Sequence, residues 1–311
     1  MSDVQTTDTR YQPGILEGVP RVARYVLFTL AGNEPPAHAI KEALTRVSPL
    51  VNGRDVVIGI APALVRALGG EIPGLHEFPA DMSAHVKVPS TPGQLWCWVR
   101  GDDLGDLLHD TRRLQKALAP AFTLRHVVDA FRHRHDDGTG FGRDLTGFED
   151  GTENPHGDEA LAAAFAQGRG EGLDGSSFVA VQQWVHDLDA FDAMPQDEQN
   201  HCIGRRLSDN EELDEAPESA HVKRPAQESF TPEAFVLRRS MPWLASTQAG
   251  LMFVAFGKSF DAFEAQMRRM AGLDDGIVDG VFKLSRPVTG AYFWCPPMRA
   301  GQLDLRQLGF S

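Results

Sequence analysis

The sequence contains no apolar run long enough to cross a membrane. Its longest apolar stretches, such as Val56–Ile60 and Leu251–Phe256, are far shorter than the roughly 20 residues that a bilayer requires. The first residues, Met1–Asp8, lack both the basic start and the apolar stretch of a secretory signal peptide. We therefore expect a cytoplasmic protein without membrane contact.

Cysteine and positive charge are also scarce. Cys97, Cys202 and Cys295 are widely spaced and form neither a C-x-x-C pair nor the C-x-x-C-H motif of covalent haem attachment. We expect them to be reduced and buried. The formal net charge of −13 opposes binding to a nucleic-acid backbone, so nucleic acid is excluded as a partner. The densest acidic run, Glu211–Glu218, is more typical of a solvated loop than of a metal site.

The length and composition are those of a soluble globular protein with more than one core. The chain has 311 residues, of which 42% are hydrophobic and 23% charged. A chain of this length predicts two domains of about 150 residues each.

An internal repeat supports two similar halves. Leu95–Gly101 is followed by Asp102–Leu114, and 156 positions later Leu251–Gly257 is followed by Lys258–Met270. Both copies predict a strand that ends in glycine and then a helix. The apolar helix positions of the first copy (Leu104, Leu107, Leu108 and Leu114) align with Phe260, Phe263, Glu264 and Met270 of the second. Only Glu264 breaks the apolar register.

The order of the elements predicts the fold. Arg24–Phe28 and Ser177–Val181 resemble each other and predict the opening strand of each half, while Val56–Ile60 followed by Pro62–Leu68 predicts a strand and a helix. This β-α-β-β-α-β alternation predicts an α+β protein with two ferredoxin-like domains related by internal duplication. We place the domains at residues 1–150 and 151–311. The Gly-rich and charged stretch of residues 136–176 would contain the junction.

The segment Arg143–Pro155 carries the strongest functional signal. It concentrates carboxylates among glycines without the periodicity of a buried helix or strand, which predicts a functional loop. Gly147 and Gly151 permit backbone angles that other residues avoid, so Asp150 is expected in a fixed, non-regular geometry suited to proton transfer.

This segment resembles the RDLTGFxDGTxNP signature of the dye-decolorizing peroxidases, whose distal aspartate lies in a G-x-x-D-G motif. Two further segments match the family at similar spacing: Ser219–Val222 resembles the segment of the proximal haem histidine, and Leu237–Pro242 resembles that of the distal arginine. The resemblance runs from about Gln12 to Gly290, and the absence of large insertions is similar to the bacterial B-type group.

The resemblance implies roles for individual residues. Asp150 and Arg238 would be the distal pair, and Arg239 is the alternative arginine. Ser240 would be the accompanying hydroxyl in a position where the B-type pattern has asparagine. His221 would be the axial ligand of the haem iron, with Asp279 or Asp275 as its acidic partner. Among the other cofactor contacts, Asn154 is assigned to haem binding, and Arg205 or Arg206 to a haem propionate.

The implied activity is that of a peroxidase with one haem b per chain and a pocket in the C-terminal half near the junction. Hydrogen peroxide would oxidise the haem to a ferryl state, and dyes, phenolics and other aromatic donors would then reduce it. Tyr11, Tyr25, Tyr292 and the five tryptophans are candidate relays for electrons. A homo-oligomer is expected.

Other functions remain as alternatives. One is a haem-handling or iron-removing protein with little peroxidase turnover. Another is a haem-free acidic interaction module, which the joint presence of Asp150, His221 and Arg238 disfavours. His126, His133 and His135 are a possible zinc cluster, but no cysteine or further spaced ligand lies near them, and ordinary solvent-facing histidines are the better interpretation.

Overall fold

A computed structural model of the protein describes residues 10–32, 35–79, 86–134 and 142–310. The first half of the described chain contains, in order, β1 (Val22–Leu30), α1 (Ala37–Val47), β2 (Val56–Ile60), α2 (Pro62–Ala67), β3 (Leu95–Gly101), α3 (Leu104–Leu118) and β4 (Phe122–Phe131). A connecting segment follows, with β5 (Gly142–Arg143), β6 (Glu149–Asp150) and α4 (Gly157–Ala164).

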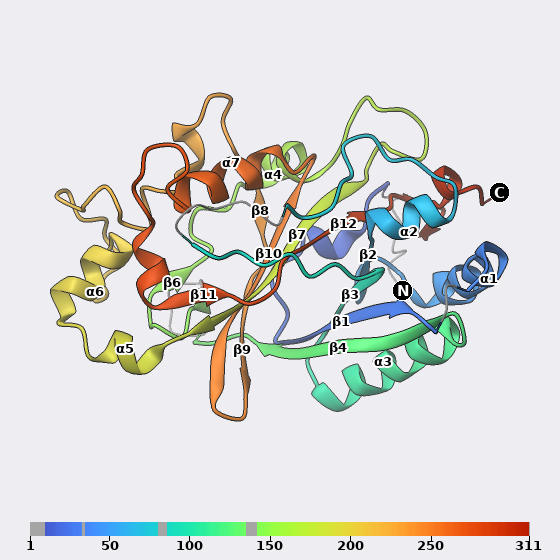
Figure 1. Ribbon diagram of the computed structural model, residues 1–311, viewed down its shortest axis with the longest axis horizontal. Helices are drawn as coiled ribbons and strands as arrows, with labels where there is room; N and C mark the ends of the chain where they lie inside the picture. The colour runs from blue at the N-terminus through green and yellow to red at the C-terminus, as the bar shows by residue number, and fades with distance from the viewer. Residues whose placement is uncertain (1–9, 33–34, 80–85, 135–141, 311) are drawn as a thin grey trace, which may run out of the picture.

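The second half begins with a long strand and two short helices, β7 (Ser177–His186), α5 (Leu188–Asp192) and α6 (Gln196–Ile203). It continues with β8 (Leu237–Arg238), β9 (Met241–Ala245), β10 (Gln248–Gly257), α7 (Asp261–Met270), β11 (Ser285–Pro287) and β12 (Ala291–Cys295). A small hairpin of β13 (Met298–Arg299) and β14 (Gln302–Leu303) ends the chain's regular structure. The helices α1 and α3 lie at one end of the molecule, and α5 and α6 lie at the other (Figure 1).

The strands of the two halves form one antiparallel sheet. Within the first half the pairing order is β2-β3-β1-β4, and within the second it is β12-β7-β10-β9. One residue pair, Trp294 with Ile60, joins β12 to β2, and another, Ala130 with Trp243, joins β4 to β9. Because both ends are joined, these eight strands close into a ring, with β8 and β11 added at β10 and β7.

The two faces of the ring have separate hydrophobic cores. Tyr25, Trp96 and Trp98 belong to one core, which fills the inside of the ring, and Tyr25 stacks on Trp98 with 6.2 Å between ring centroids. The next residue along β1, Val26, belongs to the other core, which lies under the helices. This alternation follows from the two-residue period of a strand. None of the described helices combines the length and apolarity needed to cross a bilayer.

The strands and helices predicted for the repeat are present as β3, α3, β10 and α7, but the helix bounds differ, since α7 begins at Asp261, three residues later than predicted. Helix α3 begins at Leu104, two residues later than predicted, because the Asp103 side chain accepts hydrogen bonds from the main-chain N–H groups of Gly105 and Asp106 and caps it. Leu104 and Leu108 are 47% and 45% exposed, whereas Leu107 and Leu114 are buried. The buried stripe is therefore narrower than the apolar pattern.

Gln12 reinforces the weakly paired junction between β2 and β12. Its side chain is completely buried, and it accepts a hydrogen bond from Ile58 N (2.8 Å) and donates to Ile58 O (2.9 Å) and Pro296 O (3.1 Å). The Gln12 amide thus bonds main-chain groups of both segments, which the single residue pair between β2 and β12 leaves without partners from each other.

Replacing Gln12 by leucine should lower the free energy of unfolding by about 2–4 kcal/mol, because buried main-chain groups lose their partners. Chemical denaturation measures this. The same change at exposed Gln302 is the control and should cost less than about 0.5 kcal/mol. Equal stabilities of the two variants would contradict the role given to Gln12.

Candidate active site

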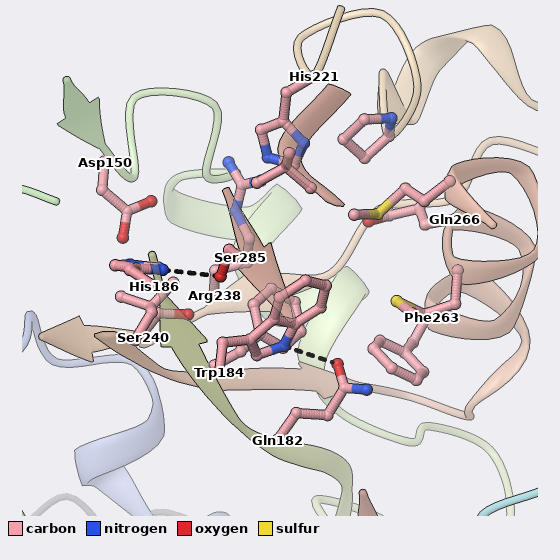
Figure 2. A pocket seen from close by; sticks show the side chains of 16 residues that line it. Asp150, Gln182, Trp184, His186, His221, Arg238, Ser240, Phe263, Gln266 and Ser285 are labelled. Atoms are coloured by element: carbon pink, nitrogen blue, oxygen red, sulfur yellow. Dashed lines mark hydrogen bonds between the residues drawn. The ribbon is translucent and has the colours of Figure 1, made fainter. Parts of the chain in front are cut away.

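A cavity lies mainly in the second half of the chain, lined by residues between Asp150 and Ser285. One side of it is apolar, with walls formed by Leu251, Phe253, Phe263, Met267, Met270 and Val281. The other side carries polar groups: Asp150, His186, Arg238 and Ser240 extend into the cavity from several elements, and His221 approaches from opposite Ser240 (Figure 2). An apolar cavity with a few convergent polar groups is the usual form of a ligand site.

His221 is held by main-chain contacts on a segment without regular structure. Its N–H donates to Cys202 O (3.0 Å), and the next residue donates to Ile203 O (2.9 Å), which fixes the segment to the end of α6. The ring atom Nδ1 lies 2.9 Å from Oδ2 of Asp279. The described residues offer Nε2 no hydrogen-bond partner, so this nitrogen is available to a ligand in the cavity.

Asp279 is buried, with 1% of its surface exposed, and its other oxygen accepts a hydrogen bond from Val281 N (2.8 Å). It reaches His221 because the following residue is Gly280, where a Cβ atom would lie 2.8 Å from Cys202 O. Burial lowers the pKa of His221, but the charge of Asp279 and its hydrogen bond outweigh burial and raise it overall. The alternative partner, Asp275, is instead paired with Arg224 at 2.7 Å.

Asp150 lies at the end of a short hairpin, where the sequence predicts an irregular loop. Residues Gly142 and Arg143 of β5 pair with Asp150 and Glu149 of β6, so the segment folds back on itself. Gly147 and Gly151 have φ values of +90° and +86°, the left-handed backbone that their presence predicts. Burial raises the pKa of the Asp150 carboxyl, while the charge of Arg238 opposes that rise.

Arg238 and Arg239 point in different directions. Arg239 donates to Ile15 O (3.0 Å) and Leu16 O (2.6 Å), so its guanidinium holds the N-terminal segment. Arg238 lines the cavity, and its Nε is buried without a hydrogen-bond partner among the described residues. A buried, unpaired guanidinium N–H is costly, and an anionic or polar ligand would satisfy it.

Asn154 fixes Arg238 through its main chain. The Asn154 side chain accepts a hydrogen bond from Arg238 N (2.7 Å) and donates to Arg238 O (3.2 Å). Its amide also donates to Gly151 O (3.3 Å), in the turn after Asp150. One side chain therefore ties the Asp150 segment to the Arg238 segment.

The remaining predicted residues lie in different places. Ser240 lines the cavity beside Arg238, and its Oγ accepts a hydrogen bond from Val254 N (3.3 Å). Arg205 is not among the lining residues, because its guanidinium pairs with Glu153 (2.8 Å) and Glu212 (2.6 Å). Glu211 and Glu212 thereby have arginine partners at one end of the acidic run.

Sequence reasoning missed a chain of three hydrogen-bonded side chains at the cavity wall. His186 Nδ1 lies 2.7 Å from Ser285 Oγ, and His186 Nε2 lies 3.0 Å from Asp144 Oδ2. Burial raises the pKa of Asp144, but the hydrogen bond and charge of His186, with bonds from Thr146, bring it to about 2. Asp144 lies in the signature segment, so the sequence offered a reason to include it in the site. The sequence around Ser285 offered no such reason.

The histidine cluster does not form a metal site in the part of the chain that the structure describes. His126 Nε2 lies 3.0 Å from the side-chain oxygen of Gln183, and His135 lies outside the described residues. No group of three or more metal-binding side chains occurs among the described residues. The cysteines are buried and unpaired, as predicted.

These features suit a haem. The apolar walls are of the kind that buries a macrocycle, and His221 presents an unpaired ring nitrogen to the cavity. Asp279 accepts from its other nitrogen, as carboxylates commonly do for metal-binding histidines. The unpaired Nε of Arg238 and the Asp150 carboxylate would face a small polar ligand on the iron.

Comparisons with known proteins agree with this site. A family model described as Dyp-type peroxidase, C-terminal, matches residues 142–300. The dye-decolorizing peroxidase of Mycobacterium tuberculosis is 30% identical over 91% of this chain and 87% of its own length. That of Mycolicibacterium paratuberculosis is 31% identical over 71% of this chain, a match that spans 63% of the relative.

Solved structures extend the similarity to the whole fold. The dye-decolorizing protein from V. cholerae has a TM-score of 0.79 and 26% identity, covering 96% of this chain and 99% of that one. A variant of DypB from Rhodococcus jostii in complex with haem has a TM-score of 0.78 and 25% identity, covering 91% and 94%. The chain therefore belongs to the Dyp-type peroxidase family.

Proposed function

We propose that the protein is a haem b peroxidase, with one haem per chain, that reduces hydrogen peroxide and oxidises dyes, phenolics and other aromatic one-electron donors. One observation carries the proposal: His221, Asp150 and Arg238 converge on a single apolar cavity from separate elements. Bound haem would supply the iron that takes up peroxide and the oxidising power that donors then consume.

His221 and Asp279 would hold the iron from one side. Asp279 accepts the Nδ1 proton and so fixes the ring with Nε2 toward the cavity. The negative charge of the Asp279 carboxylate, acting through this hydrogen bond, raises the electron density of the imidazole ring. Nε2 would therefore be a stronger donor to iron.

Asp150 and Arg238 would act on the opposite side. The Asp150 carboxylate would take the proton from the inner oxygen of peroxide and return it to the outer oxygen, which leaves as water. The guanidinium of Arg238 would stabilise the negative charge on that outer oxygen while the O–O bond breaks. Asn154 would keep the two groups in register, and Ser240 would offer a further hydrogen bond to the bound peroxide.

The role of Arg205 stays a prediction. To bind a haem propionate, its guanidinium would have to exchange Glu153 or Glu212 for the new carboxylate. Both glutamates are more than half exposed, so water replaces the lost contact at low cost.

We also propose that residues 1–150 and 151–311 are ferredoxin-like domains that arose by duplication. The support is the strand order. If β1, β2, β3 and β4 are matched to β7, β9, β10 and β12, the first half has the order β4-β1-β3-β2 and the second half has the equivalent order β12-β7-β10-β9. In addition, α3 follows β3 and α7 follows the equivalent strand β10. This order is that of a β-α-β-β-α-β unit.

Replacing His221 by alanine should remove most of the haem, because His186, the other histidine that lines the cavity, uses both ring nitrogens in contacts with Ser285 and Asp144 and has none left for a ligand. The absorbance spectrum of the purified holoprotein measures haem content and ligation. His201→Ala, on the exposed face of α6, is the matched control and should retain full occupancy. A histidine-ligated spectrum in His221→Ala would overturn the assignment.

Removing the distal groups tests the peroxidase proposal itself. In stopped-flow mixing with hydrogen peroxide, Arg238→Leu should slow the change of the haem spectrum by about 10³-fold, and Asp150→Ala by roughly 10²- to 10⁴-fold. The exposed Arg112→Leu on α3 is the control. A haem carrier would show no rapid change even in the unaltered protein. If Arg238→Leu slows the spectral change severely and Asp150→Ala does not, proton transfer would be assigned to Arg238 and a water molecule instead of Asp150.

The pH dependence should report the carboxyl of Asp150. Because burial raises its pKa above the ordinary value of about 3.9, the peroxide step should slow as the pH falls through that raised value and the base becomes protonated. Donor oxidation consumes protons, so donor turnover should have an acidic optimum while the peroxide step persists to higher pH. Rates from about pH 3 to 8 test both. An acid limb that survives in Asp150→Asn would refute this account.

A further inference from the structure

Glu264 is the one residue that interrupts the apolar register of the second repeat, and the structure gives it a specific partner. It lies on α7, one residue after Phe263, and its carboxylate accepts a hydrogen bond from the Tyr292 hydroxyl at 3.1 Å. Tyr292 is 2% exposed and the Glu264 side chain 28% exposed, so the carboxylate connects a buried phenol to the surface. A buried phenol bonded to a carboxylate is more than packing needs, since phenylalanine would fill the same space.

The Tyr292 ring lies between the cavity wall and the protein surface. On the inner side it meets Phe263 at 5.9 Å between centroids, and Phe263 lines the cavity on its α7 side (Figure 2). On the outer side it meets the ring of His76 at 5.5 Å, edge to face. The His76 side chain is 50% exposed, and its Nε2 lies 3.4 Å from the same Glu264 carboxylate.

We propose that Tyr292 carries electrons from donors at the His76 surface to the cavity, with Glu264 as the acceptor of its phenolic proton. The inference rests on the peroxidase function proposed above, which generates the one-electron oxidant in the cavity. It extends that function to donors that are too large to enter the cavity.

The step balances as follows. Tyr292 gives one electron through Phe263 to the oxidant in the cavity, and its O–H bond breaks as the proton passes to the Glu264 oxygen. A donor at the surface then gives one electron to the neutral tyrosyl radical, and the proton returns from Glu264 to the phenolic oxygen. Burial, and then the charge and hydrogen bond of Glu264, raise the pKa of Tyr292, so the phenol is protonated before oxidation and a nearby base is needed.

The other tyrosines lack this arrangement. Tyr25 is also 2% exposed, but its hydroxyl lies 3.4 Å from a main-chain carbonyl, that of Arg239, which cannot take up a proton. Tyr11 stacks on Phe165, which does not line the cavity. Because the chain has three tyrosines, a tyrosyl radical can be assigned by single substitutions.

The primary test is rapid-freeze electron paramagnetic resonance of the holoprotein after one equivalent of hydrogen peroxide, without donor. A tyrosyl radical should form in the unaltered protein, disappear in Tyr292→Phe and persist in the matched control Tyr25→Phe. Glu264→Gln keeps the hydrogen-bond acceptor but removes the base, and should lower the radical yield about tenfold. A radical unchanged in Tyr292→Phe, or unchanged in Glu264→Gln, would overturn the proposal.

A second measurement uses ferrocytochrome c, a basic protein that the net charge of −13 attracts and that cannot enter the cavity. Tyr292→Phe should slow its oxidation about tenfold while hydroquinone, a small donor, is oxidised within about twofold of the normal rate. Equal rates with ferrocytochrome c would refute the relay. If peroxide leaves the haem spectrum of the unaltered protein unchanged, both the peroxidase function and the relay are refuted. If the spectrum changes but no Tyr292 radical forms, only the relay is refuted.

Discussion

The hydrogen bonds between the Asn154 side chain and the main chain of Arg238 join two segments that are 84 residues apart. The rest of the site depends on them. They leave the Arg238 guanidinium free to enter the cavity, and the third bond of Asn154, to Gly151 O, sets the turn that follows Asp150. Asp150 and Arg238 thus share a frame without forming a salt bridge to each other among the described residues, and both charges stay directed at the cavity. The buried Nε–H of Arg238 has no hydrogen-bond partner among the described residues, which costs free energy. The contacts of Asn154 must therefore be rigid enough to keep the guanidinium in the cavity.

The opposite side of the cavity is built from different contacts and has its own electrostatics. His221 is fixed by α6 and by the turn at Gly280, and its pKa is raised chiefly by Asp279 against burial. Burial likewise raises the pKa of Asp150, which lines the same cavity. A substitution that admits water to the cavity would therefore lower the pKa of Asp150 toward its ordinary value.

Local patterns predict most of the elements and the resemblance predicts most of the site. Strand and helix periods in Leu95–Leu114 and Leu251–Met270 are local, and β3, α3, β10 and α7 follow them. The closure of the sheet is not local, since it depends on two single residue pairs between distant strands. The same holds for the Asp144–His186–Ser285 chain, which brings together common residue types from three separate segments. Arg205 shows another limit, because the sequence cannot say which of several carboxylates an arginine will choose.

The ring of strands also has a consequence for how the chain is made. Gln12 binds Pro296, 284 positions later, and β12 supplies the only strand that covers the free side of β2 in the described sheet. During synthesis, β2 therefore remains an open edge, and the aromatic interior around Trp96 and Trp98 stays accessible, until β12 has left the ribosome. An exposed edge beside an aromatic surface invites pairing with other chains. Pairing of β12 with β2 closes the ring and covers that edge late in synthesis.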